Sequence, residues 1–431
     1  MNDLAVIGAQ FGDEGKGKIV DILSQRFDVV ARYQGGHNAG HTVVVEGRKQ
    51  VLHNVPCGVV RGKTYIIGNG CVVDPDALMS EVSDLERGGI ALNDKLYVSN
   101  RAHVILPHHI YMERLAEKAK GEHKVGTTMR GIGPAYTTKA ERTGIRFCDI
   151  ESGEQFLTEK LEELYAVRGF PRAGIEGAFG SSEKEAARLV EIYGKLKEKG
   201  MRFQDTVSLI NELGKTQSIL FEGAQACWLD VDHGTYPFAT SSSATIGGAH
   251  TGTGYGKRIE KVLGITKAYS TRVGGGPLLT EMNEGFAGVI RERGGEYGAS
   301  TGRPRRCAWF DGAMNRHATN VSGFDEIGVM KIDVLDTQTE IPFCVGYKLD
   351  GRKLPDYALP DSPNDFARCE PRYIFVDGWL SPTAGIRDFE KLPPKAQYYL
   401  KLMQGVHERP ITMVSTGPDR DDIIYLPSGI A

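Results

Sequence analysis

Residues 12–18 of the chain, with the sequence GDEGKGK, carry the groups that bind phosphate in proteins. Glycines let a backbone approach an anion closely, and a helix that begins in such a stretch points its N–H groups at the anion. The spacing matches most of the phosphate-loop pattern G-x-x-x-x-G-K-[ST], but Ile19 stands where a hydroxyl group should hold magnesium. A magnesium ligand must then come from elsewhere, and the carboxylate of Asp13 is the nearest candidate. The alternative is a glycine-rich surface turn with solvated charges.

A second polar, glycine-rich loop covers residues 34–42 and contains His37 and His41. Two histidines four residues apart could bind zinc from one face of a helix. The glycines and the asparagine around them oppose a helix, however, and no third ligand follows at metal spacing. We expect one histidine to act as a donor or acid near the phosphates and the other to be an ordinary loop residue.

Three later segments combine polar side chains with a turn or a strand end. Residues 126–136 contain hydroxyl groups and Arg130, which suits either a clamp for a phosphomonoester or a plain connector. Residues 299–306 bring three arginines together, and because their forks match carboxylate and phosphate geometry, a small anionic substrate is favoured over a solvated basic turn. Asp333, in the sequence Lys-Ile-Asp, could accept the two N–H donors of guanine that adenine lacks.

The elements that must position these groups alternate between short apolar strands and amphipathic helices. We predict strands at residues 4–7, 28–33, 51–55, 65–67, 96–99, 218–221, 262–268 and 411–414, a strand end within 329–336, and helices at 16–23, 75–86, 107–120, 152–168, 181–199, 203–213 and 307–321. Ligand groups gather beyond the carboxyl ends of strands in open α/β sheets, so Gln225 is well placed. The pattern indicates a phosphate-loop-like α/β fold with a mostly parallel central sheet, helices on both faces and extra subdomains. We expect residues 1–431 to form one elaborated domain with a helical insertion at about 100–215, because no linker or repeat divides the chain.

The composition is that of an ordinary globular protein, with 40% hydrophobic and 25% charged residues, which excludes disordered and fibrous classes. A formal net charge of −3 argues against general binding to nucleic acid or membrane surfaces, although it allows a local basic pocket. Seven scattered cysteines without a C-x-x-C pair favour reduced thiols. No segment resembles a signal peptide or approaches the roughly 18 apolar residues that span a bilayer, so we expect a soluble, cytoplasmic protein.

Eight motifs, in order along the chain, closely resemble those of the adenylosuccinate synthetase family. They are GDEGKGK at 12–18, NAGHT at 38–42, the loop at 127–136, FEGAQ at 221–225, DHGTYP at 232–237, GRPRR at 302–306, KID at 331–333 and STGP at 415–418. The resemblance runs from end to end. It implies a GTP-dependent ligase that joins L-aspartate to inosine monophosphate (IMP) and yields adenylosuccinate, GDP and phosphate, the first committed step from IMP to AMP.

The resemblance also implies roles for individual side chains. Asp13 takes the proton from N1 of IMP, so that O6 becomes an anion able to attack the γ-phosphate of GTP. His41 donates a proton that stabilises the charge on O6 and the phosphoryl group, and Lys16 bridges the transferring phosphate. The amine of aspartate then displaces phosphate from 6-phosphoryl-IMP. Gln225 is the fourth catalytic candidate.

The ligand-binding residues of the family map onto four groups of this chain. GTP is assigned to Gly12, Asp13, Glu14, Gly15, Lys16, Gly17, Lys18, Gly40, His41, Thr42, Arg305, Lys331, Ile332, Asp333, Ser415, Thr416 and Gly417. IMP is assigned to Asp13, Glu14, Gly15, Lys16, Asn38, Ala39, Gly40, His41, Thr128, Arg142, Gln225, Thr240 and Arg303. Aspartate is assigned to Ala299, Ser300, Thr301, Gly302, Arg303, Pro304 and Arg305. One Mg²⁺ per subunit is assigned to Asp13 and the carbonyl of Gly40, and Arg142 reaches the neighbouring site of a homodimer.

Two residues depart from the usual family pattern, because Met129 and Ala226 stand where glycine is common. Both add bulk in loops expected to touch the nucleotide, but they remove no chemical group. Another phosphate-loop amide-type ligase or a metabolic kinase is the alternative among enzymes, and the arginine loop and the doubled histidine loop tell against a plain kinase. A regulatory GTPase needs the hydroxyl that Ile19 replaces, and a nucleic-acid-binding module needs a sustained basic face.

Overall fold

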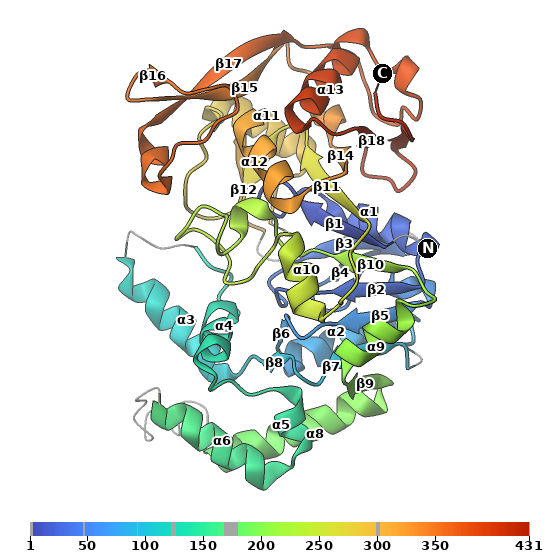
Figure 1. Ribbon diagram of the computed structural model, residues 1–431, viewed down its shortest axis with the longest axis vertical. Coiled ribbons are helices and arrows are strands. Elements are labelled where there is room, and N and C mark those ends of the chain that lie inside the picture. The colour runs from blue at the N-terminus through green and yellow to red at the C-terminus, as the bar shows by residue number, and fades with distance from the viewer. Residues whose placement is uncertain are drawn as a thin grey trace.

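A ten-stranded sheet forms the centre of the molecule in the computed structural model, which describes residues 3–45, 48–92, 94–121, 126–167, 180–298 and 302–430 (Figure 1). Its order is β19-β18-β14-β11-β1-β10-β2-β5-β7-β9. The strands are β1 (Leu4–Gly8), β2 (Val29–Arg32), β5 (Thr64–Ile67), β7 (Leu96–Ser99), β9 (Met201–Gln204), β10 (Ile219–Glu222), β11 (Lys261–Lys267), β14 (Glu326–Met330), β18 (Ile411–Ser415) and β19 (Ile423–Tyr425). Neighbouring strands are parallel except for the edge pair β18 and β19. The predicted α/β fold with a mostly parallel sheet is confirmed.

Strand β1 lies where the order of the sheet reverses, with β10 and β2 on one side and β11 and β14 on the other. Ligands bind at such a switch point, in the crevice beyond the carboxyl ends of the strands. The glycine-rich segments that follow β1, β2 and β10 all emerge at this edge.

Alternation along the strands divides the apolar side chains between two cores. In β1, Ala5 and Ile7 belong to one core and Val6 to the other. Helices α12 (Gly312–Ser322) and α13 (Pro394–His407) contribute to the first core, and α1 (Lys16–Leu23) and α2 (Pro75–Arg87) to the second. Burial on both faces explains why the central strands read as continuous apolar runs.

Helix α2 begins where the sequence predicts. The side chain of Asp74 accepts hydrogen bonds from the backbone N–H groups of Asp76 (2.9 Å) and Ala77 (3.2 Å), and Pro75 occupies the first helical position. This is a favourable start, because a proline there removes no intrahelical hydrogen bond.

Four predictions of secondary structure are wrong in part. The strand expected at 51–55 ends at Leu52, because β4 (Arg48–Leu52) pairs with β3 (His41–Val45) in a separate hairpin. The loop expected at 126–136 gives way to helix α4 (Ile132–Glu141), since Pro134 lies in its first turn, where a missing N–H is tolerated.

The other two differences arise where a short strand precedes a helix. The helix expected at 203–213 starts only at α9 (Thr206–Leu213), after β9 has joined the edge of the main sheet and Asp205 has capped the helix. The helix expected at 307–321 is preceded by β13 (Arg306–Ala308), which pairs with β12 (Ser270–Arg272), and α12 begins after its cap at Asp311.

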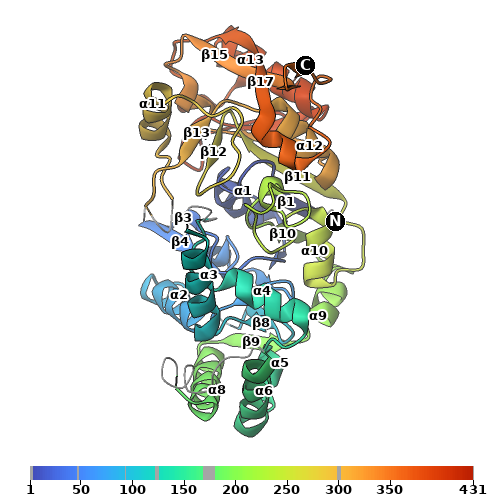
Figure 2. The same cartoon turned by 90° about the vertical axis from the view of Figure 1, so that its left-hand side faces the viewer.

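The molecule is elongated, and the sheet lies between two peripheral layers (Figures 1 and 2). Strands β15 (Glu340–Leu349), β16 (Arg352–Lys353) and β17 (Cys369–Asp377) lie with α13 at one end, and α6 (Glu154–Val167) and α8 (Ser182–Glu198) lie at the other. The remaining elements are β6 (Val72–Val73), β8 (His103–Val104), α3 (Pro107–Ala119), α5 (Phe147–Glu151), α10 (Ile246–Thr253) and α11 (Glu284–Gly294). None of the helices in the described ranges is long and apolar enough to cross a membrane.

Candidate active site

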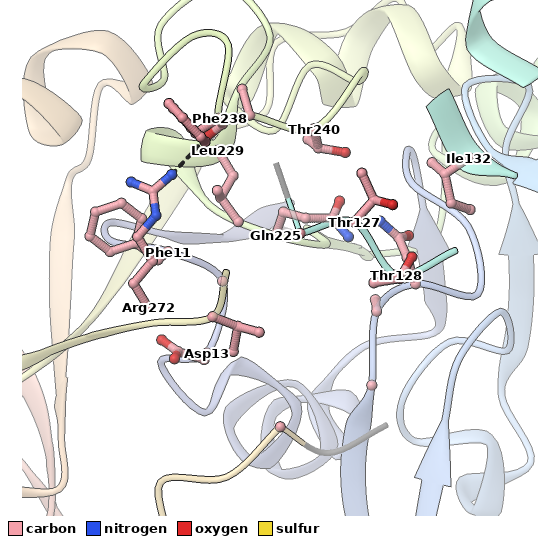
Figure 3. A pocket seen from close by; sticks show the side chains of 18 of the residues that line it. Phe11, Asp13, Thr127, Thr128, Ile132, Gln225, Leu229, Phe238, Thr240 and Arg272 are labelled. Carbon is pink, nitrogen blue, oxygen red and sulfur yellow. Dashed lines mark hydrogen bonds between the residues drawn. The ribbon is translucent and has the colours of Figure 1, made fainter. Parts of the chain in front are cut away.

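A pocket of about 290 Å³ opens beyond the carboxyl ends of β1, β2 and β10. The predicted site residues that line it are Gly12, Asp13, Asn38, Ala39, Gly40, His41, Thr128, Gln225, Thr240 and Arg305. Figure 3 shows Asp13, Gln225, Thr128 and Thr240 around this one space. The fold therefore brings together side chains from segments that are far apart in the sequence.

The phosphate loop between β1 and α1 depends on glycines. Gly12 and Gly15 both have φ of +91°, and a Cβ atom on Gly12 would lie 2.8 Å from the Cα atom of Gln225. Gly15 is the N-cap of α1, so the first N–H groups of that helix are directed at the loop. Ile19 is fully buried in the apolar core, which confirms that this position supplies no polar ligand.

The ammonium group of Lys16 is held inside the loop by Glu14. Its Nζ atom lies 2.6 Å from Oε2 of Glu14 and 3.3 Å from the carbonyl oxygen of Gly12. The Oε1 atom of Glu14 accepts the N–H groups of Gln10 (3.0 Å) and Gly12 (2.8 Å). Glu14 therefore both shapes the turn and neutralises Lys16.

Two cations face the carboxylate of Asp13. Its Oδ2 atom accepts a hydrogen bond from the hydroxyl of Thr271 and lies 3.3 Å from Nε of Arg305, and Lys267 Nζ lies 3.3 Å from Oδ1. That Oδ1 atom is buried and has no hydrogen-bond partner among the described residues. This oxygen forms an ion pair with Lys267 but accepts no hydrogen bond from the described residues, and Gly40 lines the same pocket, so the two residues could together offer oxygen ligands to a hard cation such as Mg²⁺.

His41 is fixed by a carboxylate that lies behind it. Its Nδ1 atom is hydrogen-bonded to Oε1 of Glu222, the last residue of β10, and Oε2 of Glu222 accepts the backbone N–H of Cys57 at 2.7 Å. Burial lowers the pKa of His41, and the charge of Glu222 only partly opposes this. Burial acts to raise the pKa of Glu222, but the hydrogen bond with His41, the charge of Arg32 and the N–H of Cys57 hold it below its usual range. We infer a neutral imidazole that donates to a charged carboxylate.

The ligand atoms of His41, Cys57 and Glu222 lie within 4.8 Å of one another, as in a soft-metal site. The hydrogen bonds within the group account for this arrangement without a metal. The zinc site considered for His37 and His41 is excluded, since His37 lies in a loop and His41 begins β3, so the two do not share a helix face.

Gln225 combines backbone strain with an unsatisfied side chain. Its φ is +54°, which is uncommon for a residue other than glycine, and the residue is buried. Its buried Oε1 atom has no hydrogen-bond partner in the described part of the chain. Such strain and such an unpaired amide oxygen are typical of a ligand-binding position.

The residues predicted to bind guanine follow two neighbouring strands of the sheet, β14 and β18. The Oδ1 atom of Asp333 is buried without a hydrogen-bond partner among the described residues, and burial raises the pKa of this carboxyl. Lys331, with φ of +63°, donates from Nζ to the carbonyl of Gly294 (2.7 Å) and to Glu296 (2.8 Å). The carboxylate oxygen of Asp333 that is unpaired among the described residues is an acceptor that suits the N–H donors of a base.

Lys18 points toward the loop after β18. Its Nζ atom donates to Oγ of Ser415 (2.9 Å) and to the carbonyls of Gly417 (2.9 Å) and Asp422 (3.3 Å). Burial lowers the pKa of Lys18 to about 8, although Asp422 and other carboxylates oppose the shift. Lys18 therefore connects the phosphate helix to the proposed base loop.

A fully buried carboxylate, Glu296, links these two regions. Its oxygens lie 2.5 Å from Nη1 of Arg305, 2.8 Å from Nζ of Lys331, 3.4 Å from Nζ of Lys267 and 2.5 Å from the hydroxyl of Tyr269. Burial alone would raise the pKa of Glu296, but the three cations hold it well below its usual range. The same cations Lys267 and Arg305 also face Asp13, so one anion organises the positive groups of both regions.

Several predicted residues lie outside the described lining of the pocket. They are Glu14, Gly15, Lys16, Gly17, Lys18, Thr42, Arg142, Gly302, Arg303, Pro304, Lys331, Ile332, Asp333, Ser415, Thr416 and Gly417. Arg142 and Arg303 are exposed, and Ile332 is fully buried, so only the backbone of Ile332 is available to a ligand. Ala299, Ser300 and Thr301 fall outside the described residues.

The two departures from the family pattern, Met129 and Ala226, differ in whether their backbone conformation favours glycine. Met129 has φ of +56°, a left-handed conformation that is unstrained for glycine but raises the conformational energy of a methionine. Ala226 has φ of −161°, an extended conformation open to any residue, and its side chain is buried.

Sequence reasoning missed Lys267, Arg272, Glu296 and the role of Glu222. Arg272 lines the pocket and donates to the carbonyls of Pro277 (2.9 Å) and Phe238 (2.8 Å; Figure 3), and burial and the charge of Arg306 lower its pKa to about 9. Only Glu222 lay within a recognised motif. For Lys267 and Arg272 the available signal was a charged residue near the end of the strand predicted at 262–268, which is weak evidence by itself, and Glu296 lies near no predicted strand.

The model of the family described as "Adenylosuccinate synthetase" matches residues 5–424. The chain belongs to the adenylosuccinate synthetase family. An adenylosuccinate synthetase of Solibacter usitatus is 46% identical and covers 98% of this chain and 97% of its own length, and that of Heliobacterium modesticaldum is 45% identical with 99% of both covered. Like other members of the family, the protein is a ligase of AMP biosynthesis that couples GTP to the joining of aspartate and IMP.

Solved structures agree with the assignment. A fully ligated adenylosuccinate synthetase from Plasmodium falciparum superposes with a TM-score of 0.90 at 36% identity, covering 99% of this chain and 100% of that one. A succinoaminodeoxyadenylate synthetase of cyanophage S-2L, bound to dGMP and dATP, is 21% identical, covers 99% and 96% of the two chains and has a TM-score of 0.63, which supports the fold alone.

Proposed function

We propose that Asp13 and His41 carry out the chemistry of the ligase within one pocket. The observation that carries the proposal is that both residues, together with the unsatisfied amide of Gln225, line the space beyond the phosphate loop. Asp13 takes the N1 proton of IMP, and the O6 anion attacks the γ-phosphate of GTP, so that the bond from that phosphorus to the bridging oxygen of GDP breaks. His41 stabilises the developing charge, and the aspartate amine displaces phosphate from C6.

Binding of the substrates is assigned to the groups around this centre. Asn38, Thr128, Gln225 and Thr240 surround the volume proposed for IMP, whereas Asp333, Lys331 and residues 415–417 surround the volume proposed for guanine. Arg303 and Arg305, with residues 299–304, are proposed to hold the carboxylates of aspartate. The phosphates of GTP are proposed to bind at residues 12–18 and 40–42.

Asp13 and the carbonyl oxygen of Gly40 are proposed to hold one Mg²⁺ per subunit, which would supply charge neutralisation at the phosphates. The Oδ1 atom of Asp13, which accepts no hydrogen bond from the described residues, supports this assignment. The buried Ile19 gives no such oxygen and also tells against a regulatory GTPase.

The test of the Asp13 assignment is the substitution Asp13→Asn, which keeps the size of the side chain and removes the base. We expect the rate of adenylosuccinate formation from GTP, Mg²⁺, IMP and aspartate to fall at least about 1,000-fold, within the range of lost general-base catalysis. Circular dichroism should show an intact fold. A variant with wild-type turnover would refute the role of Asp13 as base.

A homodimer in the cytoplasm is proposed as the working form, with Arg142 reaching the IMP site of its neighbour. Arg142 is exposed and has φ of +66° at the end of α4, and such strain is common at functional positions. Mixing inactive Arg142→Ala subunits with inactive Asp13→Asn subunits should restore activity to about a quarter of the wild-type level if half the chains form heterodimers with one intact site each. No recovery after confirmed subunit exchange would refute the shared site. We further propose that residues 1–431 act as one α/β unit in which the helical segment near 100–215 is an insertion.

A further inference from the structure

We propose that Glu222 is a positioning residue of the ligase, which fixes the ring orientation and the tautomer of His41 so that Nε2 faces the substrates. This inference rests on the role proposed for His41. It concerns a carboxylate that never touches the pocket contents, since Glu222 is fully buried and lies behind the histidine. No part of the sequence motif reveals this function, because Glu222 reads as the last residue of a buried strand.

The contacts of His41 determine which of its two ring nitrogens is available to a ligand. The carboxylate of Glu222 contacts Nδ1, and the Sγ atom of Cys57 lies 3.3 Å from the same nitrogen. The ring belongs to the first residue of β3, which lies in the pocket lining, so the nitrogen remaining for a ligand is Nε2. Because a carboxylate only accepts hydrogen bonds, the proton of a neutral ring must be on Nδ1, and Nε2 of the free enzyme is then an acceptor. Nε2 can donate to a substrate oxygen only after it takes up a second proton, which makes the ring an imidazolium paired with Glu222.

The carboxylate itself is held rigidly. Its Oε2 atom accepts the N–H of Cys57 at 2.7 Å, and β10 is paired on both sides, by β1 and β2. The other charged or titratable groups that act on the ring are Arg32, Lys16, Cys57 and His53. Glu222 is the anion among these groups, so it also supplies the local counter-charge when the ring interacts with a phosphoryl group.

The arrangement makes Glu222→Gln a sharp test. Glu222 serves two donors, Nδ1–H of His41 and N–H of Cys57, with two acceptor oxygens. A glutamine offers one oxygen and one NH₂ group, so it satisfies only one of these donors. Either the tautomer of His41 inverts, or a buried backbone N–H loses its partner.

We expect Glu222→Gln to lower kcat about 100-fold, which is the size of effect seen when a residue that orients a functional histidine is removed. The KM values for GTP and IMP should change less than about threefold. Glu222→Asp keeps both acceptors and should lose about tenfold. In ¹⁵N-labelled wild-type protein, the His41 signal, identified by its absence in His41→Asn, should be that of an Nδ1–H tautomer, and the Gln variant should change it. An unchanged kcat together with an unchanged tautomer would overturn the proposal.

A double-mutant cycle tests whether Glu222 acts through His41. The double variant His41→Asn/Glu222→Gln should be no slower than His41→Asn alone. If the double variant instead lost kcat by the product of the two single losses, the proposal would be overturned, since Glu222 would then act independently of His41. If His41→Asn itself retained wild-type turnover, the catalytic role of His41 would fail, whereas the tautomer measurement would still decide whether Glu222 positions the ring.

Glu81 provides a matched control for the loss of a buried carboxylate. It accepts the backbone N–H groups of His53 (2.7 Å), Asn54 (2.8 Å) and Val55 (3.2 Å). Glu81→Gln should lower the melting temperature, because one of its oxygens becomes a donor group, but it should leave the tautomer of His41 and the kcat of the folded enzyme within about threefold of wild type. An equal loss of kcat in both variants would overturn the specific role of Glu222.

Discussion

Replacing Lys18 by methionine tests whether the phosphate helix and the base loop act as one binding unit. The substitution keeps the length of the side chain but removes the ammonium group that donates to Ser415, Gly417 and Asp422. Because these acceptors belong to the loop proposed to hold guanine, we expect the loss to weaken binding of GTP and to leave binding of IMP unchanged.

The magnitude follows from the contacts. Three hydrogen bonds from a charged donor are worth about 1.5 kcal/mol each, or roughly 4–5 kcal/mol together. Lys18 is partly buried, and its pKa of about 8 shows that removing the charge from water offsets part of this gain. A net value of about 2 kcal/mol for anchoring the loop corresponds to a 30-fold increase in the Kd for GTP, at 1.36 kcal/mol per factor of ten.

Isothermal titration of the purified variant with GTP, and separately with IMP, measures both affinities. The matched control is Lys401→Met, which removes an exposed lysine of α13 and should change neither. A Kd for GTP within threefold of wild type would refute the anchoring role. Equal weakening of GTP and IMP would also refute it, because it would indicate general damage to the fold.

Two further changes test the charge network and the departure at Met129. Glu296→Gln should lower the free energy of unfolding by about 3–5 kcal/mol at pH 7, since it removes the buried carboxylate shared by Lys267, Arg305 and Lys331, and only the first two retain a second anion, Asp13. The pKa of Glu296 in the folded protein is depressed below its usual value of 4.5, so the stabilisation is complete above that pH and is lost as the pH falls toward the folded-state pKa. Urea unfolding should show that the difference in unfolding free energy between wild type and variant narrows below pH 4.5, and a constant difference would contradict the assignment. Met129→Gly should raise stability by about 0.5–1 kcal/mol, because glycine relieves the positive φ more than it increases the entropy of the unfolded chain. Met129→Ala, which keeps the strain, should show no such gain in thermal unfolding.

The sequence predicted those parts of the fold in which local pattern and tertiary packing agree. The apolar run at 4–7 becomes β1, because a buried central strand needs such a run on both of its faces, and the cap at Asp74 starts α2 through bonds to its neighbours in the chain. Strand β9 was missed, since four residues before a helix carry too little pattern and the strand is defined by its pairing with β7. Pro134 suggested a loop, although the first turn of a helix tolerates it.

The candidate site shows the same division. Glycine-rich turns and polar strand ends were recognisable, and ten of the predicted residues do meet in one pocket. The groups that hold those residues in place could not be found, because Glu222 and His41 are 181 positions apart and Asp13 and Lys267 are 254 apart, and only the parallel sheet makes them neighbours. Spacing along the chain carries no information about such pairs.

The ion pair of Glu14 and Lys16 means that an anion binding at the phosphate loop must compete with Glu14 for Lys16. An isolated lysine at a helix start attracts any small anion, including inorganic phosphate, whereas Lys16 already has a carboxylate 2.6 Å away. An incoming group must replace Glu14 as the partner of Lys16, and only a ligand anchored elsewhere, as a nucleotide is through its base, gains enough from its other contacts to do so. The loop thereby favours whole nucleotides over the free anions that resemble their phosphates.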